Sequence, residues 1–158
     1  MTEPRAQTLR FQAAANAVTR ALLRVPLLNR LVGRRLIVID VVGRTSGKLY
    51  HVPVAYTEHD GALLVGTPFA WGRNLRTGEP VTVLLKGKRV TADVTVLSDA
   101  TDVVTAYEIM ARDNSQFASF NKITLDDHGD PDPADLRLAW AAGARAFRLI
   151  PHLTPVRG

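Results

Sequence analysis

Short apolar runs, separated by polar turn residues, follow one another through the middle of the chain from residue 36 onward. The runs are rich in valine, isoleucine, leucine and threonine, which is typical of β-strands. They predict strands at 36–42, 49–57, 62–67, 80–86 and 89–97. Asp60-Gly61 and Gly87-Lys88 stand between consecutive runs and predict tight hairpins. Connections this short leave no room for crossover helices, so the pattern predicts an antiparallel sheet and excludes a parallel α/β fold.

Helical spacing dominates on both sides of this β-rich region. Residues 6–33 carry apolar side chains on one face and arginines on the other. This predicts an amphipathic basic helix, kinked near Pro26 because proline removes a backbone donor. After the fifth run, we expect Ser98 or Thr101 to cap a helix that continues to about Arg112. Further elements are expected at 67–80 (a loop with one short helical turn at most), 116–122 and 134–142 (helices) and 146–150 (a last strand).

Length and composition fit one folded domain. The chain has 158 residues, of which 46% are apolar, which is enough for one core and too little for two comfortable ones. We therefore expect an N-terminal helix over 1–34 and one β-rich domain over 35–158. Cysteine is absent, which excludes disulfides, thiolate metal ligands and thiol catalysis. A cytoplasmic location is expected, because the sequence shows no membrane-spanning stretch and no secretory signal pattern.

Positive charge is concentrated in the first third of the chain. Residues 1–48 hold only two acidic side chains, Glu3 and Asp40, against nine basic ones: Arg5, Arg10, Arg20, Arg24, Arg30, Arg34, Arg35, Arg44 and Lys48. This asymmetry suggests an anionic partner, which is a cofactor tail, a lipid surface or nucleic acid. Nucleic acid is disfavoured because Phe11 is the only aromatic residue before Tyr50, so bases would find no stacking platform among the arginines. Peripheral membrane contact through the N-terminal helix stays open as an accessory property.

The turn after the first predicted strand is the best candidate for binding an anion. It reads Gly43-Arg44-Thr45-Ser46-Gly47-Lys48. Its glycines permit the positive φ of a tight turn, and two cations, two hydroxyls and several unpaired N–H groups are expected to converge on one concavity. A phosphate or a carboxylate would suit that concavity. The alternative is an ordinary solvated hairpin turn, in which the same residue types are common.

Side-chain catalytic motifs are absent from the sequence. It contains no nucleophile elbow, Walker loop or His-Glu-x-x-His zinc motif. The four histidines are scattered and are expected to be surface groups. The acidic stretch 126–133 is expected to be a solvated loop, because two prolines disrupt any calcium-loop register. We therefore predict no metal site and assign no catalytic side chain, so redox chemistry would have to come from a bound cofactor.

Several short motifs follow one another in an informative order. They are Gly43 to Lys48, Pro53-Val54, Asp60-Gly61, Trp71-x-x-Asn74-Leu75, Pro80-Val81-Thr82-Val83 and Gly87. Together they resemble the deazaflavin-dependent nitroreductase family over about residues 35–97, and the final Phe147 to Pro151 is also similar. The resemblance implies a split β-barrel, the fold of flavin reductases and pyridoxamine phosphate oxidases, which binds coenzyme F420.

The resemblance also implies roles for individual residues. The phosphate and polyglutamate tail of the cofactor would be held by Gly43, Arg44, Thr45, Ser46, Gly47 and Lys48. Its ring would lie against Thr67, Pro68, Phe69, Ala70, Trp71 and Asn74, with backbone amides of 67–70 steadying the polar edge of the ring. Trp71 would be a wall of the pocket, and the alternative is a core tryptophan. The reduced cofactor would pass a hydride to a quinone-like, nitroaromatic or other conjugated electrophile.

The substrate side differs from that family. In members that reduce nitroimidazoles and quinones, late tyrosines cover the substrate. Here Phe117 and Phe120 occupy roughly that segment, so we expect both to contact the substrate without donating a proton. The loop before Trp71 is also shorter, with Pro68 and Phe69 in place of a glycine-rich insertion. The same barrel could instead bind FMN, haem or a lipid, or serve as a carrier or interaction protein, and either a monomer or a homodimer fits the resemblance.

Overall fold

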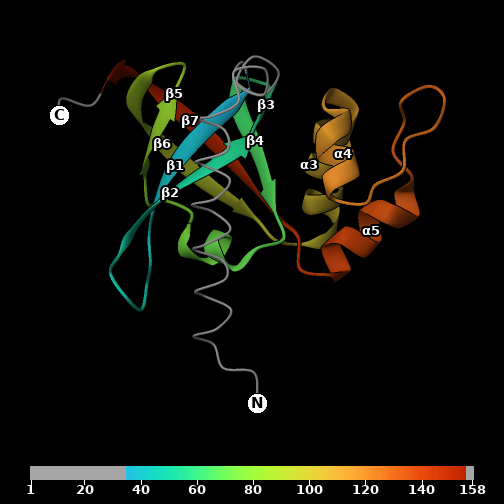
Figure 1. The fold of residues 1–158 in the computed structure, drawn as a ribbon, viewed down its shortest axis with the longest axis horizontal. Coiled ribbons are helices and arrows are strands. Elements are labelled where there is room, and N and C mark those ends of the chain that lie inside the picture. Colours follow the sequence, from blue (N-terminus) through green and yellow to red (C-terminus); the bar gives the residue numbers. More distant parts are fainter. Residues whose placement is uncertain (1–34, 156–158) are drawn as a thin grey trace, which may run out of the picture.

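The computed structural model describes residues 35–155, and the side chains among them up to His152. The basic helix predicted over 6–33 lies outside the described residues. Within them, the strands form one antiparallel sheet in the order β2-β1-β5-β6-β7-β4-β3 (Figure 1). The strands are β1 (Leu36–Val42), β2 (Leu49–Ala55), β3 (Thr57–His59), β4 (Ala62–Thr67), β5 (Val81–Leu85), β6 (Lys88–Leu97) and β7 (Arg145–Pro155). The prediction of a mainly antiparallel β domain is confirmed.

Alternating burial along β1 shows how the sheet builds its core. Ile37, Ile39 and Val41 are almost fully buried, whereas the residues between them are partly exposed. Successive side chains on a strand point to opposite faces, so one face of β1 lies inside the curled sheet. Val52 of β2 and Val83 of β5 are opposite Ile39 in the two registers and are also buried. The inner faces of neighbouring strands therefore meet in one barrel core.

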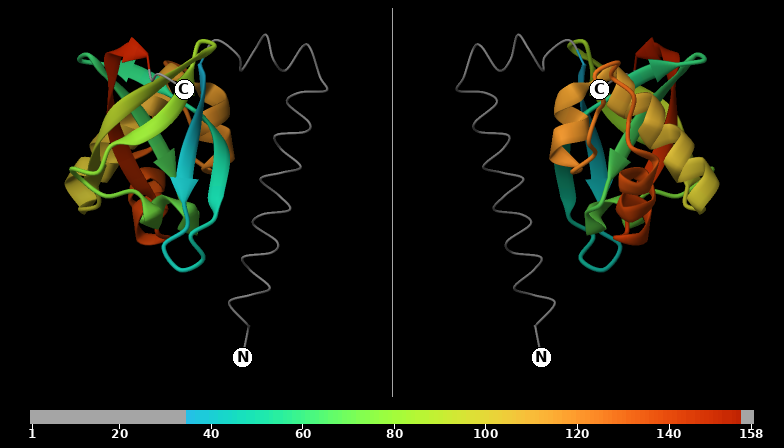
Figure 2. Two further views of the ribbon diagram at one scale, coloured as in Figure 1. Left: turned by 90° about the vertical axis from the view of Figure 1, so that its left-hand side faces the viewer. Right: turned by 90° about the vertical axis from the view of Figure 1, so that its right-hand side faces the viewer.

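A break at Tyr56 divides the predicted strand 49–57 into β2 and β3, so the prediction of one continuous strand is wrong. The Tyr56 N–H donates to the carbonyl oxygen of Arg35 (2.9 Å), and β3 then pairs with β4. As a result, β2 and β3 are the two edges of the sheet order, although only Tyr56 separates them in the chain. The sheet must curl to place both edges beside one residue, and the side views show this open barrel (Figure 2).

Helices α3 (Ala100–Asp113), α4 (Ser115–Phe120) and α5 (Pro133–Ala141) lie together on one side of the barrel (Figure 1). Helix α3 begins one residue away from where we expected it, because Asp99 and neither Ser98 nor Thr101 is its cap. The Asp99 carboxylate accepts from the N–H of Asp102 (3.3 Å). Carboxylates cap helices as well as hydroxyls do, so Asp99 was a candidate that the prediction of Ser98 or Thr101 passed over.

A second core joins α3 to the outer face of β4 and β7. Tyr107 and Met110 of α3 are almost fully buried, together with Leu64 of β4 and Ala146 of β7. The close approach depends on Gly66, because a Cβ there would lie 2.7 Å from Cε1 of Tyr107 and 3.0 Å from Cε of Met110. Strand β4 is thus buried on both faces, by the barrel core and by α3.

The last strand is longer than predicted. We expected it to end at Ile150, but β7 continues through Pro151 to Pro155. Pro151 is opposite Ala92 of β6, beside a register shift in that ladder. A shift of this kind tolerates a proline because the regular hydrogen bonds are already interrupted. The loop between β4 and β5 contains one short helix, η1 (Ala70–Asn74), in agreement with the single turn allowed for it.

We expect Gly66→Ala to lower the free energy of unfolding by about 1–3 kcal/mol, the usual cost of overpacking a core. The reason is the contact between the added methyl group and the Tyr107 ring. Urea unfolding measures the change. In the Tyr107→Ala background the ring is gone, so the same methyl group should cost little, and fully additive losses in the double variant would contradict this account of Gly66.

Candidate functional site

The β1–β2 turn is well ordered by hydrogen bonds within itself. The Gly43 N–H donates to the Lys48 carbonyl (2.8 Å), and the Gly47 N–H, at a residue with φ +68°, donates to the Gly43 carbonyl (2.9 Å). The Lys48 N–H donates to Oγ of Ser46 (3.2 Å). We had expected several unpaired N–H groups in this turn, and that expectation is wrong for these residues. Any anion bound here would depend mainly on side chains.

Asn74 connects this turn to η1. Its Oδ1 accepts from the N–H of Arg44 (3.1 Å), and its Nδ2 donates to the carbonyl oxygen of Trp71 (3.0 Å). Both ends of the amide are therefore used inside the protein. The bond to Arg44 joins two segments that the sequence predicted separately, the basic turn and the Trp71 segment.

Four cationic side chains lie on these two segments. Arg44 and Lys48 belong to the turn, Arg73 to η1, and Arg76 follows two residues after Asn74; all four are exposed. None of the ion pairs found among residues 35–155 includes any of them. Arg73 and Arg76 were not among the predicted site residues, although their spacing around Asn74 is visible in the sequence. The hydrogen bond between Arg44 and Asn74 places the turn beside the segment that carries Arg73 and Arg76.

The segment from Thr67 to Trp71 forms the base of the site. Thr67 is buried and its Oγ1 accepts from the N–H of Phe69 (3.0 Å). Pro68 has no N–H. This stretch therefore has fewer backbone N–H groups that could donate to a cofactor ring than we expected. Trp71 is 4% exposed and stacks on Phe147 of the barrel core, with ring centroids 6.1 Å apart and planes at 25°. This packing supports the interpretation of Trp71 as a core tryptophan that anchors η1.

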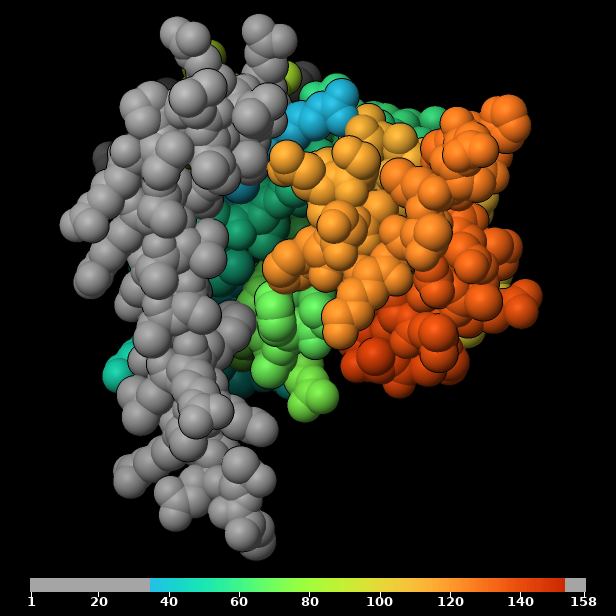
Figure 3. Space-filling view, turned by 45° about the vertical axis from the view of Figure 1, so that its right-hand side comes forward, coloured from blue at the N-terminus to red at the C-terminus, as the bar shows by residue number. Residues whose placement is uncertain are grey.

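Phe69 and Phe120 come together at the surface. Their rings meet edge to face with centroids 6.1 Å apart, and they are 48% and 66% exposed. The loop after β4 and helix α4 lie side by side on one face of the molecule (Figure 3). Pro68 and Ala70 beside Phe69 are exposed as well. A residue predicted to contact the cofactor ring is thus in contact with one predicted to meet the substrate.

Phe117, the other predicted substrate residue, packs inward. It meets the ring of Tyr107 edge to face at 5.1 Å and is partly buried. The Tyr107 hydroxyl donates to the carbonyl oxygen of Arg145 at 3.4 Å. Burial raises the pKa of Tyr107, and the nearby Arg145 charge offsets the shift only in part. Tyr107 is therefore a protonated core residue and does not replace the surface phenol that the resemblance led us to look for.

Histidines and acids elsewhere form pairs. His51 Nδ1 lies 2.7 Å from Oδ1 of Asp40, whose Oδ2 also binds Arg89 at 3.0 Å. His59 and His152 lie 3.2 Å and 3.0 Å from neighbouring carboxylates. In the part of the chain that the structure describes, no group of three or more histidine or acidic side chains is arranged to hold a metal ion. No helix in that part is long and apolar enough to span a bilayer.

Comparison with known proteins identifies the fold. No protein-family model matches this sequence, and no match was found among curated proteins. Among solved structures, the haem storage protein HutZ from Vibrio cholerae has a TM-score of 0.50 at 13% identity, with 83% of this chain and 92% of HutZ covered. A pyridoxamine 5'-phosphate oxidase-related, FMN-binding protein from Nostoc punctiforme has a TM-score of 0.48 at 18% identity, with 86% and 79% covered.

A putative 5-nitroimidazole antibiotic resistance protein from Bacteroides thetaiotaomicron is more distant, with a TM-score of 0.42, 8% identity and coverage of 81% and 80%. At such low identities the likeness concerns the fold. The predicted split β-barrel with flanking helices is confirmed.

Replacing Asn74 with alanine should release the turn from η1 and lower the free energy of unfolding by about 1–2 kcal/mol, because two hydrogen bonds are lost. The sharper measurement is hydrogen exchange at the Arg44 amide, which should accelerate. Asn74→Asp keeps the acceptor for that amide and should preserve its protection. An Arg44 amide that stays equally protected in Asn74→Ala would contradict the role given to Asn74.

Burial of Tyr107 predicts a dependence of stability on alkaline pH. Its pKa is raised in the folded state, so above about pH 10, where an unfolded tyrosine loses its proton, unfolding releases a proton that the folded protein retains. The contribution of the Tyr107 pKa shift to the free energy of unfolding is therefore fully present below about pH 10 and is lost as the pH rises above it. In Tyr107→Phe the slope should be shallower by up to about 1.4 kcal/mol per pH unit. Equal slopes in chemical unfolding between pH 9 and 11 (roughly the range of tyrosine ionisation) would contradict this assignment.

Proposed function

We propose that this protein is an F420-dependent reductase that reduces a flat conjugated electrophile of the quinone or nitroaromatic kind. One observation carries the proposal. The hydrogen bond from Arg44 to Asn74 brings four cations without described ion-pair partners to the segment that presents Phe69 and, across from it, Phe120. A ligand that fits both features is flat and aromatic at one end and strongly anionic at the other, as a deazaflavin with a phosphate and polyglutamate tail is.

The tail would be held by side chains. Arg44 and Lys48 supply charge from the turn, Arg73 and Arg76 supply it from η1 and the residue following it, and the hydroxyls of Thr45 and Ser46 can add hydrogen bonds. Exposed ion pairs contribute only about 0.2–1 kcal/mol each, so affinity would come from the number of contacts. Gly43 and Gly47 shape the turn that positions these groups.

The ring would lie on the surface of Pro68, Phe69 and Ala70, with Phe120 beside it. Thr67 and Trp71 act behind this surface, where they hold the loop and η1 in place. When bound in its reduced form, the cofactor supplies a hydride. The protein's part is to orient ring and substrate face to face and to exclude water, which is where most of the catalytic effect of such a site lies. Phe120 would line the substrate side from α4, and an apolar electrophile suits it. Phe117 packs inward against Tyr107 and would hold α4 in place behind this surface.

The alternative is a split barrel that binds FMN or another ligand without reducing a substrate. It is favoured by the burial of Tyr107, which takes this phenol away from the surface that Phe120 presents. Solved structures of this fold include an FMN-binding protein and a haem storage protein, so the fold itself is compatible with both chemistries. FMN carries a single phosphate and would need the turn but not Arg73 and Arg76.

Titration of the full-length protein with F420 and with FMN, followed by fluorescence at low and high salt, tests the proposal. We expect F420 to bind more tightly and with the steeper salt dependence. Arg73→Ala and Arg76→Ala should each weaken F420 binding by about two- to fivefold, as loss of an exposed charge contact predicts, and should leave FMN binding nearly unchanged. Arg44→Ala and Lys48→Ala should also affect F420 more than FMN, since the long tail makes more contacts.

Arg137→Ala on α5 is the matched control, because it removes one exposed positive charge away from the site. Equal losses in Arg137→Ala and in the four site variants would reduce the effect to net charge. Tighter binding of FMN would select a flavin protein, and binding of neither cofactor would leave the carrier function.

A further inference from the structure

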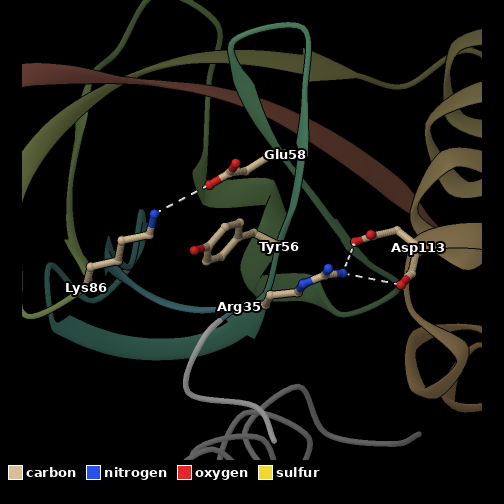
Figure 4. Close-up of a pocket in the computed structure, with 5 residues that line it drawn as sticks. All are labelled: Arg35, Tyr56, Glu58, Lys86 and Asp113. Carbon is tan, nitrogen blue, oxygen red and sulfur yellow. Dashed lines mark hydrogen bonds and ion pairs between the residues drawn. The ribbon is translucent and has the colours of Figure 1, made fainter.

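A second candidate site lies at the opposite end of β1. The β1–β2 turn follows Val42, whereas this cavity begins at Arg35, directly before Leu36, so the length of β1 separates the two, about 23 Å at the usual rise per strand residue. The cavity measures about 290 Å³ and is lined by Arg35, Tyr56, Glu58, Lys86 and Asp113 (Figure 4). These residues come from the start of β1, the β2–β3 junction, β3, the β5–β6 turn and the end of α3.

One wall of the cavity is fixed. Arg35 Nη1 lies 2.6 Å from Oδ2 of Asp113 and 3.3 Å from the carbonyl oxygen of the same residue. Thr57 Oγ1 donates to the Asp113 carboxylate at 2.8 Å. Asp113 is the last residue of α3, and its carboxylate lies next to the negative end of the helix dipole, which is unfavourable. The positive charge of Arg35 compensates for the carboxylate and for the helix end. This pair therefore serves the attachment of α3 to the barrel and would not open easily.

The opposite wall is loosely paired. Nζ of Lys86 lies 3.7 Å from Oε1 of Glu58, and both side chains are 67% exposed. Such an ion pair contributes little, so a ligand can replace it at small cost. The backbone beneath it is well defined, because Lys86 and Gly87 both have positive φ (51° and 80°), as the tight β5–β6 turn requires. The Lys86 and Glu58 charges thus lie near each other but form only a weak ion pair.

Tyr56 lies between the two ion pairs (Figure 4). It is 3% exposed, and its backbone is held by the hydrogen bond to Arg35. Its ring gives the cavity an apolar surface among four charged side chains. The cavity is therefore small, neutral in total charge and partly aromatic.

We propose that this cavity binds a small zwitterion of the free α-amino-acid class, with its carboxylate on Lys86, its ammonium group on Glu58 and its side chain against Tyr56. A simple anion would take Lys86 and leave Glu58 without a partner, and a simple cation would do the reverse. A molecule with both charges replaces the Lys86–Glu58 pair completely. The volume lies at the lower limit for small-molecule sites, which excludes ligands as large as FMN or haem.

Calorimetric titration of the full-length protein with the common amino acids, each in turn, tests this assignment. The amino acid that binds best is then compared with its N-acetyl and its amide derivatives, each of which lacks one charge. We expect both derivatives to bind about two- to fivefold more weakly, since each leaves one exposed wall charge unpaired. Glu58→Gln and Lys86→Met should each weaken binding of the free amino acid by a similar factor. Lys88→Met removes a neighbouring exposed charge that does not line the cavity and should change affinity less than twofold (about 0.4 kcal/mol).

Binding of the N-acetyl derivative as tightly as the free amino acid would overturn the proposal in favour of an anion site. Absence of binding for every amino acid at about 10 mM would also overturn the proposal, since the binding free energy would then be weaker than about −3 kcal/mol, too small for a specific site. Circular dichroism of the two variants checks that they fold, which we expect because both positions are largely exposed. The test involves neither F420 nor FMN and is independent of the proposed reductase activity.

Discussion

The ladder between β4 and β7 is the constraint on which both halves of the molecule depend. Leu63, Val65, Phe147 and Leu149 point from it into the barrel, and Leu64 and Ala146 point from it toward α3. Because side chains alternate, a slip of one residue would exchange the two sets and empty both cores. The ladder also ends beside Gly66 and Thr67, where the chain must let Tyr107 approach and then turn into the loop that carries Phe69. Packing in the core thus determines where the surface loop begins.

The strands could be predicted well because their information is local. Runs such as 36–42 and 62–67 are dense in β-branched and aliphatic residues, and the structure gives β1 and β4 the same bounds. Where the predicted strand bounds were wrong, a residue far away in the sequence determines where the strand ends. The break at Tyr56 arises from the carbonyl of Arg35, and β7 continues past Pro151 because its partner strand shifts register there. Neither feature has a counterpart in the local pattern.

The candidate site shows the same division. Residue types marked the turn and the Trp71 segment as parts of one predicted site. No local pattern shows that the Asn74 side chain accepts a hydrogen bond from Arg44, thirty positions away in the chain. That bond changes two interpretations. The amides of the turn are mostly used inside the protein, so side chains are left as the candidate anion ligands, and Arg73 and Arg76 join these candidates. The role of Trp71 was ambiguous from the sequence, because a tryptophan suits a hydrophobic core and the wall of a ligand pocket equally well until its neighbours are known.

The two ends of β1 differ in how their charges are satisfied, and this difference bears on what each end can bind. At the β1–β2 turn, the exposed cations form no ion pair with a carboxylate of the described residues, so their positive potential extends into the solvent. At the Arg35 end, the two described cations of the cavity, Arg35 and Lys86, each have a carboxylate within 4 Å, so their potential cancels at a distance and acts only on a ligand that is already in contact. Long-range attraction would therefore favour the polyanion proposed for the first end, whereas only short-range complementarity would select the zwitterion proposed for the second. Under these two proposals, a single barrel would keep two ligands of different charge apart without a second domain.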